Sequence, residues 1–201
     1  MKVLYIKAIM ALIFVSLILS GCQKDHWITT KEEFDIEEAK AILRATWDPV
    51  YQMVNEKNII TPGIKVKSLK EFKTAYGFTN MEEQAVKEYI FSLLINGDAD
   101  NPEKDAEGYI VFGNDKITVT ADNLINDAIY VDHAYIQTMK REKANITETK
   151  LVIVERSKPG NPRTDDFERF NYFEKNDEGN WILTNIGGNG ISIVIYNPDG
   201  D

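Results

Sequence analysis

The fold is decided by the stretch MEEQAVKEYIFSLLING, which covers residues 81–97. Apolar residues in this stretch recur every three or four positions, and this spacing predicts an amphipathic helix that ends at Gly97. Beyond Gly97 the apolar period falls to two residues, the period of a strand with one buried face. The chain therefore places helices before strands, an order typical of α+β folds. We expect N-terminal helices packed on one face of a curved antiparallel β-sheet.

The first helix is expected to begin after Asp35. The spacing from Asp35 to Glu38 is that of a capping box, and an apolar stripe at helical spacing then runs as far as Val54. Pro49 interrupts this stripe, because a proline ring clashes with the carbonyl one turn earlier. We therefore expect the helix to kink or to restart there, with Asp48 as the new N-cap.

Capping and turn residues place the remaining elements. Ser68 is expected to cap a short helix that Gly77 ends, and Thr79 or Asn80 is expected to cap the helix over 81–94. Residues 96–108 read as an acidic loop. Runs of aromatic and β-branched residues between turns predict strands at residues 109–112, 117–119, 129–140, 146–156, 167–174, 181–186 and 191–196, the first two as a hairpin.

The N-terminal residues have the pattern of a bacterial lipoprotein signal. Lys2 and Lys7 precede an apolar core of about 12 residues, which is too short to cross ~30 Å of hydrocarbon. The segment ends in Leu19-Ser20-Gly21-Cys22, which resembles the lipobox. The resemblance implies that signal peptidase recognises Leu19, Ser20 and Gly21 and that Cys22 carries the lipid. The alternative is a plain secretory signal, which would leave the chain's single cysteine as an unpaired thiol.

This interpretation divides the chain into three parts. Residues 1–21 are a signal peptide, residues 22–33 a polar tether, and residues 34–201 one α+β domain. We expect the mature protein on the extracytoplasmic face of the cell membrane, held by acylated Cys22, because each buried acyl CH₂ contributes ~0.8 kcal/mol. By resemblance to Gram-negative lipoproteins, Gln23 in place of aspartate after Cys22 implies the outer membrane if the cell is Gram-negative.

Charge separates the expected partners into two classes. The chain has 23 lysines and arginines against 32 aspartates and glutamates, a formal net charge of −9. Nucleic acid is excluded as a partner, because binding it requires clustered basic residues that neutralise phosphates. A basic protein would instead be attracted to this surface.

Motifs for catalysis or metal binding are weak. The two histidines are His26 and His133, so a zinc site of His and Cys is not expected. His133 follows Asp132 in a predicted strand, where neighbours point to opposite faces, so an acid–base pair is not expected either. No serine lies in a GxSxG elbow, and lipidation consumes Cys22. We predict a protein that is not an enzyme and holds no metal or cofactor.

Two loop motifs favour structural roles. Calcium-loop spacing is matched by Asn96, Asp98, Asp100 and Glu107. A solvated loop is favoured, however, because Asn101 stands where the sharp turn of such a loop needs glycine. The run Gly187-Gly188-Asn189-Gly190 lies between two predicted strands, which favours a hairpin turn over a phosphate cradle.

Several short motifs, in order, resemble a known family. Glu37-Glu38-Ala39-Lys40 opens a helix that ends in Trp47, and Tyr89-Ile90 lies in the third helix. An acidic turn then leads into a closing strand, Asp177-Glu178-Gly179-Asn180-Trp181-Ile182-Leu183. This order resembles the IseA-type inhibitors of cell-wall DL-endopeptidases. The last motif also resembles the nuclear-transport-factor-like or SnoaL-like cone domains.

The resemblance implies a membrane-anchored, non-catalytic surface lipoprotein that binds and restrains a secreted peptidoglycan hydrolase. The alternative is a lipoprotein that binds a small ligand or peptide in a cone-shaped pocket between helices and sheet. In that case the aromatic residues would line the pocket, whereas otherwise we expect most of them in the core. An enzyme is the third alternative.

Overall fold

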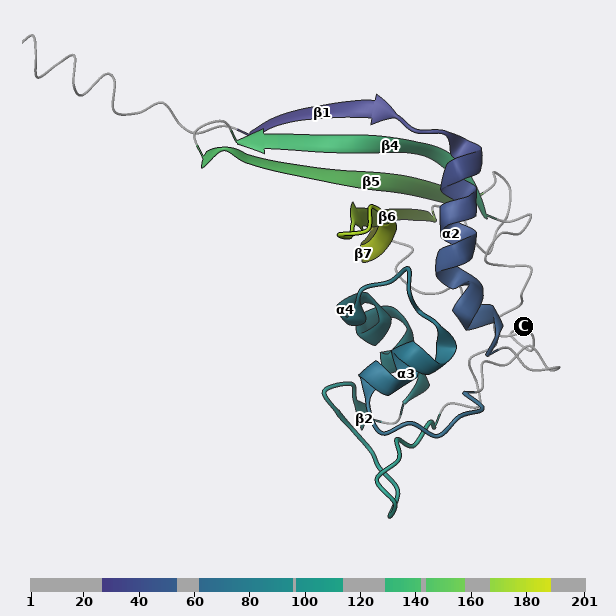
Figure 1. The fold of residues 1–201 in the computed structure, drawn as a ribbon. Coiled ribbons are helices and arrows are strands. Elements are labelled where there is room, and N and C mark those ends of the chain that lie inside the picture. The colour runs from purple at the N-terminus through teal and green to yellow at the C-terminus, as the bar shows by residue number, and fades with distance from the viewer. Residues whose placement is uncertain are drawn as a thin grey trace, which may run out of the picture. The chain divides into compact units, whose positions relative to one another are not determined.

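A computed structural model describes residues 27–53, 62–95, 97–113, 129–141, 144–157 and 167–188. These residues form an α+β fold with helices on one face of a five-stranded antiparallel sheet, as predicted (Figure 1). The strand order is β1-β4-β5-β6-β7. The helices lie between β1 and β4 in sequence, so most of the sheet follows them along the chain.

The pairing of the central strands is regular up to one bulge. Glu155 lies opposite Arg169 where β5 pairs with β6, and the register of β6 with β7 shifts between Tyr172 and Phe173. The sheet strands are β1 (Trp27–Glu33), β4 (Ile129–Arg141), β5 (Ile146–Ser157), β6 (Glu168–Lys175) and β7 (Trp181–Gly188), and a separate ribbon consists of β2 (Gly97–Asp98) and β3 (Asn101–Pro102).

Contacts divide the chain into two compact units. The smaller unit consists of Met1–Thr30 and Thr138–Glu148, of which the structure describes the ends of β1, β4 and β5. The larger unit consists of Lys31–Gln137 and Thr149–Asp201 and contains the helices, the ribbon and the core. The groove and the polar clusters described below all belong to the larger unit.

Residues 27–33 form an edge strand and not the tether expected there. All seven residues of β1 are exposed, which explains why their polarity resembles that of a linker. Trp27, Ile28, Thr29 and Thr30 nevertheless have the aromatic and β-branched side chains that favour strands. Pairing with β4 therefore extends the structured region to Trp27.

Helix α2 (Ile36–Tyr51) is capped as the sequence predicts. The Asp35 carboxylate accepts a hydrogen bond from the Glu38 amide at 2.8 Å. The helix continues through Pro49 to Tyr51, so the expected restart at Asp48 is wrong. Pro49 lies in the last turn, where a missing N–H removes one hydrogen bond close to an end that would fray in any case.

The predicted third helix contains a π-helical turn. Helical residues 83–94 consist of α4 (Glu83–Val86), the π-turn η1 (Lys87–Phe91) and α5 (Ser92–Leu94). The expected cap at Thr79 or Asn80 is wrong, because the preceding residues pair with β7. The Glu82 amide donates to the Leu183 carbonyl at 2.9 Å, and the Leu183 amide donates to the Asn80 carbonyl at 2.9 Å.

The core fills the space between the helices and the sheet. Phe72 of α3 (Leu69–Tyr76) is fully buried, and its ring centroid lies 5.7 Å from that of Phe78 and 5.4 Å from that of Phe91. Trp47 from α2 and Phe173 from β6 are also buried. These aromatic residues therefore lie in the core, as expected for most aromatic residues, and do not line a pocket between helices and sheet.

Residues 97–113 differ from the predicted loop and strand. The ribbon β2–β3 lies within the expected loop, and residues 109–112 make only isolated bridges, from Ile110 to Lys104 and from Phe112 to Ile95. The predicted strands at 117–119 and 191–196 lie outside the described residues, as do the signal peptide and Cys22.

Candidate functional site

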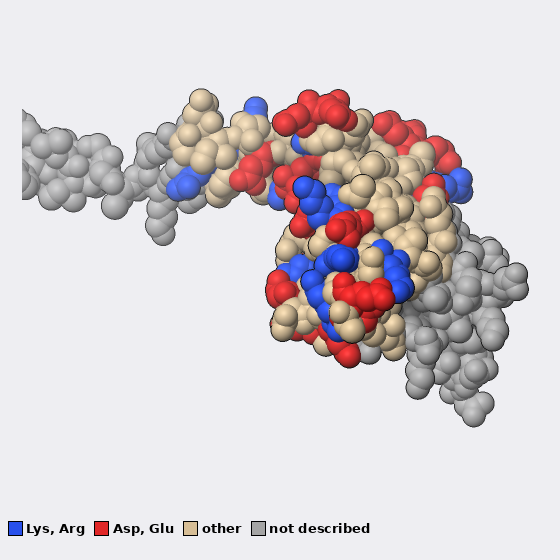
Figure 2. Space-filling model, turned by 60° about the horizontal axis from the view of Figure 1, so that its bottom comes forward, with Lys and Arg blue, Asp and Glu red and all other residues tan. Residues whose placement is uncertain are grey.

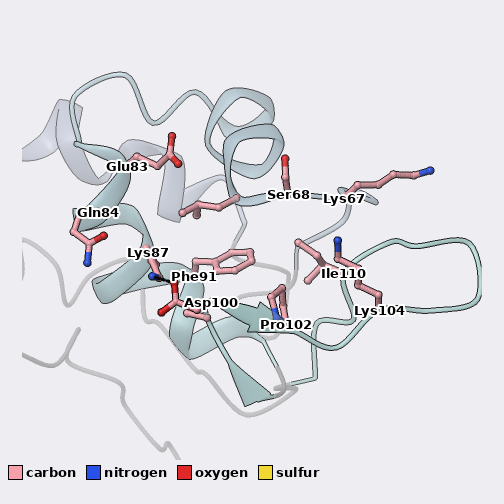
Figure 3. Close-up of a pocket in the computed structure, with 12 residues that line it drawn as sticks. Lys67, Ser68, Glu83, Gln84, Lys87, Phe91, Asp100, Pro102, Lys104 and Ile110 are labelled. Carbon is pink, nitrogen blue, oxygen red and sulfur yellow. Dashed lines mark hydrogen bonds and ion pairs between the residues drawn. The ribbon is translucent and has the colours of Figure 1, made fainter.

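A groove lies between the helical segment 83–91, the start of α3 and the segment 97–113 (Figure 3). Its volume is about 560 Å³, within the usual range of ~300–1,000 Å³ for ligand sites. Figure 3 shows Glu83 and Gln84 at one end, Lys104 and Ile110 at the other, and the ring of Phe91 between them. Leu69, Ala99 and Pro102 complete its apolar lining.

A capping box at the start of α3 shapes one side of the groove. The Ser68 hydroxyl accepts a hydrogen bond from the Glu71 amide at 3.2 Å, and the Glu71 carboxylate accepts one from the Lys67 amide at 2.7 Å. The first bond satisfies a free amide of the first turn, and the second ties the helix to the residue before its N-cap. Ser68 thus acts as a helix cap, as predicted, and Leu69 is placed against the groove.

The π-turn η1 sends its side chains in two directions. Lys87 and Phe91 line the groove, whereas Tyr89 reaches β7. The Tyr89 hydroxyl donates to Asn185 Oδ1 at 2.6 Å and accepts from the Ile186 amide at 3.1 Å. A π-turn adds a residue to the helical turn and often occurs at functional sites. Here it lets one helix contact both the groove and the sheet.

Backbone pairing fixes the wall opposite the helix. The Ile110 amide donates to the Val66 carbonyl at 2.8 Å, and Lys104 faces Ile110 across a β-bridge. Asp105 Oδ1 accepts from the amides of Glu107 and Tyr109, both at 2.9 Å. The hydrogen bond from Tyr109 is the main reason that the pKa of Asp105 is lowered. These hydrogen bonds therefore fix the backbone position of Lys104 in the wall.

Charges of both signs surround the groove. Lys87 forms an ion pair with Asp100, which connects η1 to the turn between β2 and β3. Lys67 extends away from the groove in Figure 3, and its Nζ lies 4.6 Å from the centroid of the Tyr109 ring. Figure 2, which brings the lower part of Figure 1 forward, shows basic and acidic side chains interleaved on this face.

The carboxylates with calcium-loop spacing do not converge. Asp98 Oδ1 accepts from the Asp100 amide at 2.9 Å, Asp100 pairs with Lys87, and Glu107 lies 3.5 Å from Lys65 Nζ. Asn96, the first position of the proposed spacing, lies outside the described residues. Within the described ranges, no group of three or more His, Cys, Asp or Glu side chains could hold a metal.

Asp132 and His133 contact each other, contrary to the expectation from strand alternation. His133 Nδ1 lies 2.8 Å from Asp132 Oδ2. Arg156 Nη1 lies 3.1 Å from the same oxygen, and Tyr130 donates to Oδ1 at 3.2 Å. The His133 hydrogen bond is the main cause of the lowered pKa of Asp132.

A second polar cluster is buried in the core. Arg169 Nε donates to Glu155 Oε2 at 2.7 Å and Nη2 to Oε1 at 3.0 Å, and Asn171 Nδ2 donates to Oε2 at 2.7 Å. All three residues are at most 3% exposed. The Arg169 guanidinium lies 5.5 Å from the centroid of the Trp47 ring. This cluster joins α2 to the sheet.

The predicted lipidation residues Leu19, Ser20, Gly21 and Cys22 lie outside the described residues. Where the structure does describe the chain, its helices are too short or too polar to span a bilayer.

Comparisons with protein-family models, with curated proteins and with solved structures find no match to this chain. The residues that carry the resemblance to IseA-type inhibitors have local structural roles. Asn176 Oδ1 accepts from the amides of Glu178 and Asn180, at 3.1 and 2.9 Å, and Gly179 adopts a φ of 85°. The motif over 177–183 thus makes a turn that leads into β7.

Sequence reasoning did not identify the groove. Its charged residues come from three segments, with Lys67 before α3, Lys87 in η1 and Lys104 after β3. No spacing rule connects them, because only tertiary contacts bring them together. The one local signal was the excess of lysine over residues 65–73 in an acidic chain, with four lysines against one glutamate.

Proposed function

We propose that this chain is a lipid-anchored, non-catalytic protein of the extracytoplasmic membrane face that binds and restrains a cell-wall peptidoglycan hydrolase. The groove is the observation that carries the proposal. Its apolar floor and its charged ends are chemically suited to holding a polypeptide segment of a partner. Ser68, the hydroxyl group nearest to it, is used as a helix cap.

Three further observations support the same function. The sequence Leu19-Ser20-Gly21-Cys22 resembles a lipobox, which would place the domain close to secreted wall enzymes. The formal net charge of −9 attracts basic proteins over distances of about a Debye length, ~10 Å at 0.1 M salt. The order of motifs from Glu37 to Leu183 resembles inhibitors of DL-endopeptidases.

Hydrolysis of purified cell walls tests the proposal. A purified DL-endopeptidase is added to walls with and without a micromolar excess of the mature chain carrying Cys22→Ser, and turbidity is followed. We expect slower loss of turbidity with the chain. An unchanged rate at this excess contradicts the proposal.

A second candidate function is transport or sensing of a small ligand or peptide. The volume of the groove favours it, although the groove lies beside α3 and η1 and not between helices and sheet, where we expected a pocket. Equilibrium dialysis against wall-derived peptides distinguishes the two functions, because only this candidate predicts binding of a free ligand together with undiminished hydrolase activity.

A further inference from the structure

The groove carries opposite charges at its two ends. Figure 3 places the carboxylate of Glu83 on the α4 side and the ammonium of Lys104 on the side of segment 97–113. Both side chains are exposed. In the ranges that the structure describes, neither makes an ion pair within the chain, so both charges are available to a ligand.

The middle of the groove is apolar and electrically balanced. Leu69, Ala99 and Pro102 are half-buried and supply its accessible apolar surface, whereas Phe91 is fully buried and Ile110 is 6% exposed. Lys87 and Asp100 neutralise each other. A molecule that lies along the groove therefore meets a carboxylate, an apolar floor and an ammonium in that order.

We propose that the groove binds an extended polypeptide segment of a partner protein, with a basic side chain at Glu83, an apolar side chain against Leu69, Ala99 and Pro102, and an acidic side chain at Lys104. In an extended chain, side chains at positions 1, 3 and 5 point to the same side and span about 13 Å. Five residues of an extended segment therefore present three side chains on one side. The inference rests on the proposed function only for the identity of the partner, a peptidoglycan hydrolase.

The charge arrangement predicts a change of specificity. Lys104→Glu gives the groove two acidic ends, which favour a segment with two basic residues. Glu83→Lys gives it two basic ends, which favour a segment with two acidic residues. Exposed ion pairs of this kind change affinity by about two- to fivefold each.

The experiment uses the mature chain with Cys22→Ser and three labelled, terminally capped peptides. Their sequences are Lys-Thr-Leu-Thr-Glu, Lys-Thr-Leu-Thr-Lys and Glu-Thr-Leu-Thr-Glu, and binding is measured by fluorescence anisotropy. The unsubstituted groove is expected to bind the mixed-charge peptide two- to fivefold more tightly than either of the others. Lys104→Glu is expected to prefer the doubly basic peptide, and Glu83→Lys the doubly acidic one.

Lys70→Glu is the matched control. Lys70 is exposed on α3 and does not line the groove, and its substitution changes the net charge as much as Lys104→Glu does. It should leave the mixed-charge peptide as the preferred ligand. The inference is overturned if no peptide binds, if neither groove variant changes the order of affinity, or if Lys70→Glu changes it equally.

Failure of this inference is distinguishable from failure of the proposed function. Peptides that follow the expected order while wall hydrolysis proceeds at an unchanged rate contradict the hydrolase as the partner and leave the groove specificity standing. Slowed hydrolysis with peptides that do not follow the order contradicts the groove as the binding site.

Discussion

Arg169 is the charged side chain most completely enclosed by the described part of the chain. It is 1% exposed, makes two hydrogen bonds to Glu155 and lies near the rings of Trp47 and Phe167. A buried ion pair contributes little net stability compared with apolar side chains, but removing one partner leaves an uncompensated charge. The contribution of Arg169 to stability therefore depends on the presence of Glu155, and that of Glu155 on the presence of Arg169.

Substitution of Arg169 tests this dependence. Arg169→Met is expected to lower the free energy of unfolding by about 3–5 kcal/mol, since Glu155 is then buried without its cation. Arg169→Met combined with Glu155→Leu should be more stable than Arg169→Met alone. Urea denaturation measures both variants. Additive losses in the double variant would show that the two residues are not coupled.

Asp132 makes a pH-dependent contribution at the residue scale. His133, Arg156 and Tyr130 face its carboxylate, and the hydrogen bond from His133, followed by the charge of Arg156, lowers its pKa below 3.8. A lowered pKa stabilises the folded state above the unfolded pKa, and this stability is lost as the pH falls through the folded pKa. Asp132→Asn should therefore be less stable than the unsubstituted chain at pH 6.

The difference in the free energy of unfolding between Asp132→Asn and the unsubstituted chain should become smaller below pH 3.8, where the carboxyl group of the unfolded chain is mostly protonated. Chemical denaturation at pH 6 and at pH 3 measures it. A difference of the same size at both values would show that the stabilisation does not come from the ionised carboxylate.

At the scale of elements, β7 lies close to the backbone of β6 at Gly188. Its φ is 99°, and a Cβ at this position would lie 2.3 Å from the Glu168 carbonyl oxygen. Gly179, in the turn before β7, has a φ of 85° but open space around it. The two glycines have similar backbone conformations and differ in steric room.

Alanine substitution at the two glycines separates the cost of a positive φ from the cost of a steric clash with the β6 backbone. Gly179→Ala is expected to destabilise the fold by about 1 kcal/mol, the scale of a strained left-handed residue. Gly188→Ala should destabilise it more, because the backbone of β6 must also move. Thermal unfolding of both variants gives the comparison. Equal losses would contradict a close approach at Gly188.

Local sequence signals predicted the elements that depend on local interactions. The caps at Asp35 and Ser68 and the end of α3 at Gly77 are confirmed, because each depends on hydrogen bonds within four residues. The start of α4 was wrong, since pairing with Leu183 about 100 residues away decides it. The groove was missed for the same reason: tertiary contacts such as the hydrogen bond from Ile110 to Val66 bring its walls together.

At the scale of the whole molecule, the proposed function combines long-range attraction with a local site. In this proposal, the net negative charge attracts a basic hydrolase, and the groove selects a segment with charges of both signs. Lipidation at Cys22, which stays a prediction, would concentrate this interaction at the membrane. Lys104→Glu and Lys70→Glu change the net charge equally, but of the two lysines only Lys104 lines the groove. Comparing the two variants therefore separates attraction by the net charge from selection by the groove.

The rate of wall hydrolysis at increasing concentrations of chain tests the central claim most directly. Turbidity loss under a DL-endopeptidase is compared for the unsubstituted mature chain, Lys104→Glu and Lys70→Glu, all carrying Cys22→Ser. We expect the unsubstituted chain and Lys70→Glu to slow hydrolysis at similar concentrations, and Lys104→Glu to require about two- to fivefold more. Hydrolysis that none of the three slows would contradict the account.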